Sequence, residues 1–140
     1  MLTRYFASTL TDQAQQPSSV FAATRLTVKP MDEKRYRQLL DDTFSRVDAA
    51  FEPVDPDVAE VTVSQGALTI TYLESQRLML TPQPSPRQLW VAFRDRAWHF
   101  DWDEGGRCWL DDRGQGVELY GLIEETTRAA AAATIRIARP

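Results

Sequence analysis

The sequence has 140 residues, of which 43% are hydrophobic and 26% are charged, with a formal net charge of −4. This length and composition are typical of one folded domain and exclude a disordered chain. The single cysteine, Cys108, excludes an internal disulfide framework and any cysteine-based zinc or iron–sulfur cage made by one chain. A metal would therefore be held by oxygen ligands. Because no apolar run approaches the roughly 18 residues that span a membrane, we expect no membrane contact.

The first thirty residues are rich in Ser, Thr, Gln and Ala and show no sustained helical or strand periodicity. We expect residues 1–30 to be a disordered N-terminal extension and residues 31–140 to form the folded domain. The segment lacks a secretion signal, which favours a cytoplasmic protein. Its few acids and scattered Arg and Ser resemble a transit peptide, so a mitochondrial location stays an alternative.

Acidic residues are concentrated in residues 31–60, where nine acids stand against four bases and give this window a charge of −5. The window therefore holds more than the whole net charge of the chain. No basic footprint for nucleic acid exists, and the charge is expected to attract cations or a basic protein surface instead.

Hydrophobic periodicity predicts an amphipathic helix at residues 32–52, ended by Pro53, and a second helix at residues 117–132. Between them the period changes to two, and short turns with Gly or Pro separate the segments. Two helices and a sheet with one apolar face predict an α+β fold, a two-layer sandwich with both helices on one face of a mainly antiparallel sheet. The six expected strands are residues 58–63, 67–73, 77–81, 87–93, 97–102 and 107–111, and residues 134–137 are expected to be a short extended piece.

Strand alternation also assigns side chains to the two faces of the sheet. Val61 and Val63, and the aromatic set Trp98, Phe100 and Trp102, are expected to face the core. Trp90 belongs to the opposite, polar set and is expected on the outer face. An exposed tryptophan there indicates an anchor for another protein, although a loop or the N-terminal segment covering it is the alternative.

Acidic side chains form a stripe along one edge of the first predicted helix. Asp41, Asp48 and Glu52 fall beside its apolar face by helical geometry, and three further acids follow in the turn and the first strand: Asp55, Asp57 and Glu60. Carboxylates without His or Cys favour hard cations such as Mg, Ca, Mn and iron. In water they bind weakly, because each contributes only about 1 kcal/mol at 4 Å. A solvated face that serves only solubility explains the same charges.

No complete set of catalytic residues is recognisable in the sequence, and we expect a protein that is not an enzyme. His99 is the only histidine, with Asp101 on the same strand face, but no nucleophile or oxyanion donor accompanies them. Cys108 is interpreted as a packing residue. Phosphate-binding glycine motifs are absent from the sequence.

Four segments of the sequence together resemble the frataxin family. They are residues 81–92, which contain Gln-x-Trp, residues 99–102, which end in Asp-Trp, and residues 106–109 and 112–114. The element order and the acidic first helix resemble the same family. The resemblance covers residues 31–140 and is closest to bacterial members. It implies a regulator of iron–sulfur cluster assembly that binds ferrous and ferric iron weakly. It also implies docking on a cysteine desulfurase and its scaffold protein. The implied metal residues are Asp32, Asp41, Asp48, Glu52, Asp55, Asp57 and Glu60, and the implied partner-binding residues are Gln83, Gln88 and Trp90.

Several positions depart from the pattern of the family. Thr81 stands where Asn is usual, Pro53 and Ala59 stand where acids are common, and Arg37 replaces a histidine found in some bacterial members. The stripe is therefore thinner, which favours desulfurase docking over iron affinity. The alternatives are ferroxidase or iron-storage activity at the same stripe and a non-metal interaction module. We expect a monomer, with iron-dependent oligomers as an alternative.

Overall fold

Residues 31–140 are described by the computed structural model, and the prediction for residues 1–30 lies outside the described residues. Two helices flank six strands in the order that the sequence predicts. The elements are α3 (Glu33–Ala50), β2 (Ala59–Ser64), β3 (Ala67–Tyr72), the 3₁₀ turn η1 (Leu73–Ser75), β4 (Arg77–Gln83), β5 (Gln88–Phe93), β6 (Arg96–Asp103), β7 (Cys108–Asp111) and α4 (Leu119–Ala131).

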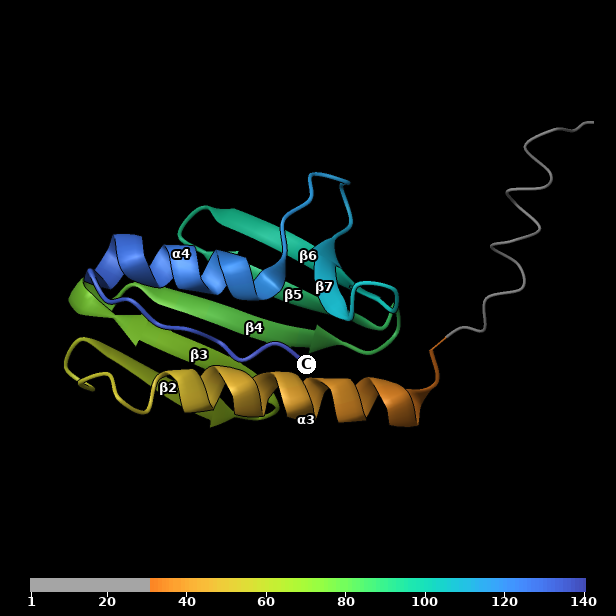
Figure 1. Cartoon of the computed structure of the whole chain (residues 1–140), viewed down its shortest axis with the longest axis horizontal. Coiled ribbons are helices and arrows are strands. Elements are labelled where there is room, and N and C mark those ends of the chain that lie inside the picture. Colours follow the sequence, from red (N-terminus) through yellow and green to blue (C-terminus); the bar gives the residue numbers. More distant parts are fainter. Residues whose placement is uncertain (1–30) are drawn as a thin grey trace, which may run out of the picture. The chain divides into compact units, whose positions relative to one another are not determined.

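The strands form one antiparallel sheet whose spatial order, β2-β3-β4-β5-β6-β7, follows the chain. Short turns make this order possible, as between β2 and β3, where Gln65 and Gly66 both have positive φ. Both helices lie on the same face of the sheet (Figure 1). The predicted α+β two-layer sandwich is therefore confirmed, and the opposite sheet face carries no helix.

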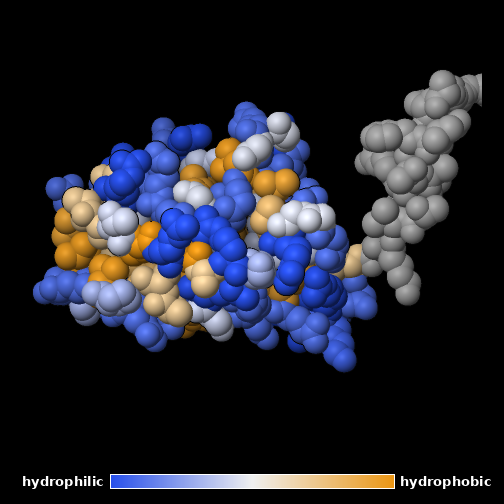
Figure 2. All heavy atoms as spheres, viewed as in Figure 1, coloured by the Kyte–Doolittle hydropathy of each residue, from blue (hydrophilic) through white to orange (hydrophobic). Residues whose placement is uncertain are grey.

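The core lies between the helices and the inner face of the sheet. Alternate residues of β3 and β4 are fully buried there, including Leu68, Ile70 and Leu80. From α3, the Thr43 hydroxyl accepts a hydrogen bond from Trp109 Nε1 at 2.9 Å, which ties the helix to β7 inside the core. On the helix-bearing side, hydrophilic residues predominate, and apolar residues gather near the place where α4 ends (Figure 2).

Three side chains expected in the core are not fully buried. Val61 on the edge strand β2 is half-buried. Val63 is 57% exposed because β2 is an edge strand with a neighbour on one side only. Trp102 is half-buried near the end of β6, where its ring meets Trp109 edge-on at 5.4 Å. Trp98 and Phe100 are buried as expected.

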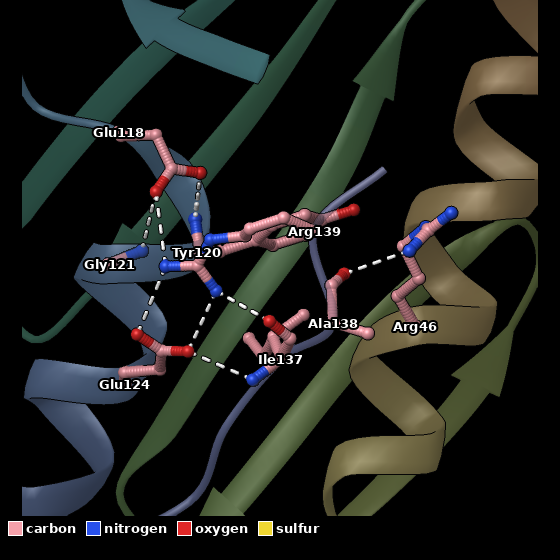
Figure 3. A network of polar contacts seen from close by, with 8 residues as sticks. All are labelled: Arg46, Glu118, Tyr120, Gly121, Glu124, Ile137, Ala138 and Arg139. Carbon is pink, nitrogen blue, oxygen red and sulfur yellow. Dashed lines mark hydrogen bonds and ion pairs between the residues drawn. The ribbon is translucent and has the colours of Figure 1, made fainter. Parts of the chain in front are cut away.

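The chain after α4, where a short extended piece is expected at residues 134–137, joins no strand of the sheet. It nevertheless buries Ile137, which is 1% exposed, between the two helices. Glu124 on α4 accepts hydrogen bonds from Ile137 N–H at 2.9 Å and from Arg139 at 2.8 Å, while Arg46 on α3 donates to Ala138 O at 3.0 Å (Figure 3). The last residues thus tie α3 to α4.

The ion pair with Arg139 lowers the pKa of Glu124 below its usual value; burial opposes this change, and the Ile137 N–H supports it.

None of the helices in residues 31–140 is long and apolar enough to cross a membrane.

Candidate functional site

The acidic ridge comprises the seven carboxylates expected to bind metal, and the structure leaves all of them exposed. They come from α3 and its N-cap, the turn after it and the start of β2. The members are Asp32, Asp41, Asp48, Glu52, Asp55, Asp57 and Glu60.

Three members of the ridge line one shallow hollow. Asp48 and Glu52, one helical turn apart on α3, meet Glu60 of β2 around it. Its floor is apolar and includes Phe51 and Val61. Glu60 lies on a strand, so the helical periodicity that relates Asp48 to Glu52 does not extend to it. Only the folded chain places Glu60 beside these two residues.

The other ridge residues stand apart from this hollow. Asp32 is the N-cap of α3, and its carboxylate accepts the Arg35 N–H at 2.8 Å. Nine residues of helix place Asp41 roughly 13 Å further along the axis. Asp41 itself lies beside Lys34 and Arg37, which dilute its charge.

The turn between α3 and β2 holds the last two members of the ridge. Asp55 Oδ1 accepts the Asp57 N–H at 2.9 Å, so one carboxylate shapes the turn that carries the other. The structure therefore divides the predicted ridge into the N-cap Asp32, the diluted position Asp41 and an acidic end. The acidic end comprises Asp48, Glu52, Asp55, Asp57 and Glu60.

The arginines of α3 pair with acids outside the ridge. Arg37 pairs with Glu33, Arg46 with Asp42 at 2.7 Å and Arg35 with Glu104 at 3.2 Å. Within residues 31–140, no ridge carboxylate has a basic group within 4.0 Å. The negative charge of the acidic end is therefore available to a partner.

The donor set of the ridge suits hard cations, since it consists of carboxylate oxygens only. In the described part of the chain, no three His, Cys, Asp or Glu side chains are gathered so that they could hold one ion. The geometry thus supports ion contacts through one or two carboxylates, which are weak and exchangeable.

The second candidate surface, the sheet-face cluster, lies on the face without helices and comprises Gln88, Trp90, His99, Asp101 and Asp112. The Trp90 ring, whose residue is 36% exposed, stacks on His99 with centroids 4.0 Å apart and an angle of 13°. Trp90 Nε1 donates to Gln88 Oε1 at 2.8 Å. Gln88 Nε2 in turn donates to Asp101 at 3.1 Å and to Asp112 at 3.2 Å. Trp90 is therefore held in one orientation before any partner arrives.

A small hollow lies beside this indole ring. Gln83 and Thr81 of β4, which pair with Gln88 and Trp90 across the strands, form one wall, and Ala97 of β6 lies on the other side. The three expected partner-binding residues, Gln83, Gln88 and Trp90, are thus close together. Sequence reasoning missed the contribution of His99, because the register that places it against Trp90 is invisible in either strand alone.

The groups considered for catalysis do not form a catalytic set. The carboxylate nearest to His99 is Asp112, with 3.6 Å between Nδ1 and Oδ2, while Asp101 hydrogen-bonds Gln88. Burial, and then the nearby carboxylates of Glu118 and Asp103, raise the pKa of the Cys108 thiol, which keeps it unreactive.

These features define a class of small α+β sandwich proteins with an acidic helix edge beside an open antiparallel sheet. The Frataxin-like domain family matches residues 29–133. The iron–sulfur cluster assembly protein CyaY of Stutzerimonas stutzeri is 38% identical over 98 residues, covering 70% of this chain and 87% of the relative. The protein of the same name from Azotobacter vinelandii is 38% identical over 97 residues, covering 69% and 86%.

Solved structures agree with this family at the level of the fold. Frataxin from Psychromonas ingrahamii superposes with a TM-score of 0.70 at 21% identity, covering 78% of this chain and 100% of that one. A trimeric frataxin from the yeast Saccharomyces cerevisiae, complexed with ferrous iron, gives 0.57 at 22% identity, covering 84% and 100%. The chain belongs to the frataxin family, and its relatives are iron–sulfur cluster assembly proteins of the CyaY type.

Proposed function

We propose that this chain regulates iron–sulfur cluster assembly by docking on a cysteine desulfurase and its scaffold protein. Docking uses the acidic ridge and the sheet-face cluster, and the chain contributes no catalytic group of its own. The observation that carries the proposal is the acidic end of the ridge, where Asp48, Glu52 and Glu60 surround one hollow without a basic partner among the described residues.

Charge supports this role, because exposed carboxylates steer a basic surface toward them over roughly the Debye length, about 10 Å at 0.1 M salt. The arginines that would cancel the ridge are engaged with Glu33, Asp42 and Glu104. The acidic end therefore favours a basic docking patch on the desulfurase.

The sheet-face cluster supports the same role through shape. Tryptophan is enriched among residues that dominate binding energy, and an indole that is already fixed loses little entropy on binding. Trp90 meets both conditions through its stack on His99 and its bond to Gln88.

Iron enters the proposal as a weakly bound ion, ferrous or ferric, on the ridge. A pair of carboxylates without a third ligand binds a divalent ion at about the millimolar level, because each contributes only about 1 kcal/mol per unit charge in water. The choice of iron as the ion is supported by the solved yeast frataxin, which is complexed with ferrous iron. The functional unit is residues 31–140, and we place the protein in the cytoplasm as a monomer.

Titration against a cysteine desulfurase at low salt tests the docking. Replacing Asp48, Glu52 and Glu60 by Lys is expected to weaken binding at least tenfold, and this loss should shrink as salt is added. A control with the same change in net charge replaces the exposed acids Glu74, Asp95 and Glu125 by Lys. Equal binding by the ridge variant and the wild type would remove the ridge from the mechanism.

A ferrous iron titration in the absence of oxygen tests the ion. The wild type is expected to show weak binding, and the variant with Asp48→Asn, Glu52→Gln and Glu60→Gln is expected to lose most of it. Iron binding that is equally strong in this variant would place the ion elsewhere.

A further inference from the structure

The two edge strands of the sheet differ in whether a further backbone segment bonds to their outer side. At the β7 edge, Asp111 N–H donates to Val117 O at 3.0 Å, and Leu110 forms a bridge with Glu118, so the following loop covers the strand. At the other edge, β2 pairs with β3, and no other backbone among residues 31–140 pairs with β2.

The hydrogen-bonding pattern shows which groups of β2 point away from the sheet. Tyr72 N–H donates to Gln76 O at 2.7 Å, so the peptide groups of Tyr72 face β4. Alternation along β3 then turns Thr71 and Thr69 toward β2, where they pair with Glu60 and Thr62. The intervening residues of β2, Val61 and Val63, therefore direct their N–H and C=O groups outward.

The turn after β2 gives the same register independently. Gln65 and Gly66 have φ of 53° and 82°, as in the two-residue turn that closes a hairpin on a hydrogen-bonded pair. That pair is Ser64 and Ala67, which makes Val63 an outward-facing position.

Among residues 31–140, the charge of Glu60 is the one feature of the β2 edge that keeps other strands away. Exposed edges commonly carry Lys, Pro, a bulge or a covering segment. The strand Ala59–Ser64 has neither Lys nor Pro, its register with β3 is unbroken, and Val63 is 57% exposed. Such an edge can accept a further strand, whose main-chain groups would bond those of Val61 and Val63.

The charge beside this edge selects the strand that fits. The hollow lined by Asp48, Glu52 and Glu60 also includes Val61, so acidic residues lie next to a residue whose peptide groups face outward. A second copy of the chain would bring two such groups of carboxylates together, which like-charge repulsion disfavours. A segment with basic side chains would instead gain opposite charge at the same place.

We propose that the β2 edge binds an extended, basic segment of the partner as a seventh strand of the sheet. The segment pairs with Val61 and Val63 through its main chain and places basic side chains against Asp48, Glu52 and Glu60. This inference rests on the proposed docking to a cysteine desulfurase and specifies how part of that docking is made.

Two substitutions at position 63 distinguish a contact made by the main chain of β2 from one made by the Val63 side chain. Val63→Pro removes the outward N–H and leaves the β2–β3 bonds intact, whereas Val63→Thr keeps the N–H and preserves branching. With the desulfurase, Val63→Pro is expected to raise Kd at least tenfold and Val63→Thr less than twofold. Thermal unfolding checks that both variants are folded. Equal binding by wild type and Val63→Pro would overturn the inference while leaving the ridge proposal standing.

Amide hydrogen exchange of the wild type covers the case in which Val63→Pro does not fold. The amides of Val61 and Val63 are expected to exchange at least tenfold more slowly in the complex, with no such change at Asp111, whose amide is bonded to Val117 O on the covered edge. Unchanged exchange at both valines in a formed complex would overturn the inference.

A short synthetic peptide that alternates lysine and valine tests the edge without the desulfurase. It is expected to protect the amides of Val61 and Val63, and an N-methylated version of the same peptide is expected not to. Protection by the peptide, together with no binding of the desulfurase, would reject the proposed function and keep the edge site. No protection by the peptide would count against the edge site itself.

Discussion

The acidic ridge and the sheet-face cluster differ in how firmly their side chains are held. The carboxylates of Asp48, Glu52 and Glu60 have no ion-pair partner within the described residues, so they remain free to follow an approaching charge. Trp90, in contrast, is fixed by a stack on His99 and a hydrogen bond to Gln88.

In the proposed docking, this difference separates two contributions to one binding event. Flexible exposed charges act over several ångströms, change the association rate and weaken with salt. A fixed, half-exposed ring acts only at contact, and its effect appears mainly in the dissociation rate. If the two surfaces act in these different ways, substitutions in each should differ in their effects on the two rates and in their dependence on salt.

Removing the indole is expected to have the largest effect on docking. Trp90→Ala should weaken binding to the desulfurase about thirtyfold, or about 2 kcal/mol, mainly through faster dissociation and at all salt concentrations. Surface plasmon resonance measures both rates. Met79→Ala is the control, because Met79 is 41% exposed on the same sheet face but lies outside the cluster. Equal losses for the two variants would show that the cluster has no special role.

Charge reversal on the ridge is expected to depend on position. Glu52→Lys should weaken docking about tenfold at low salt, since Glu52 belongs to the acidic end of the ridge. Asp41→Lys should weaken it about threefold, because Lys34 and Arg37 already dilute that site. Association rates at several salt concentrations measure the difference. Identical effects at both positions would argue for a uniform ridge instead of an acidic end.

Loosening Trp90 without removing it is expected to have an intermediate to small effect. Gln88→Ala removes the acceptor of the indole N–H and the bridge to Asp101 and Asp112. Docking should weaken about fivefold, which corresponds to about 1 kcal/mol, typical of one hydrogen bond. NMR of the indole N–H resonance reports the loss of order in the unbound protein. A fully retained resonance position and affinity would contradict the assigned role of Gln88.

The contact between α4 and the C-terminal residues is expected to affect stability and not docking. Because the pKa of Glu124 is lowered in the folded protein, its contribution is present above the usual glutamate pKa and is lost as pH falls through the lowered value. Glu124→Gln should therefore reduce the free energy of unfolding by between about 0.5 and 1 kcal/mol at pH 7 and by less in acid.

Urea unfolding at pH 7 and at pH 3 measures this loss. Glu125→Gln is the matched control, since Glu125 forms only an exposed pair with Arg128. A loss for Glu124→Gln that is as large at pH 3 as at pH 7 would contradict the role assigned to the charge of Glu124.

Periodicity and turn residues were sufficient to predict the order of helices and strands. They carry this information because each element buries one face, and that face repeats every 2 or 3.6 residues. The C-terminal contact was not predictable in this way. Ile137 is buried, its N–H donates to Glu124 on α4, and the next residue accepts a hydrogen bond from Arg46 on α3. A short segment without hydrophobic periodicity gives no sign of such distant partners.

The candidate site was predictable to a similar extent. Helical geometry placed Asp48 and Glu52 on one edge, but the addition of Glu60 depends on how β2 lies against α3. Alternation placed Trp90 on the outer face, whereas its stack on His99 depends on the register between β5 and β6. Local pattern thus placed Asp48, Glu52 and Trp90, and the tertiary structure determines which residues lie beside them.

The most direct test of the two-surface account is an NMR titration of the ¹⁵N-labelled chain with an unlabelled cysteine desulfurase. The amide signals of Asp48, Glu52 and Glu60 and the indole signal of Trp90 are expected to shift or broaden together, while signals of α4 and the C-terminal residues stay unchanged. Changes confined to α4 and the C-terminal residues, with both surfaces unaffected, would contradict the account.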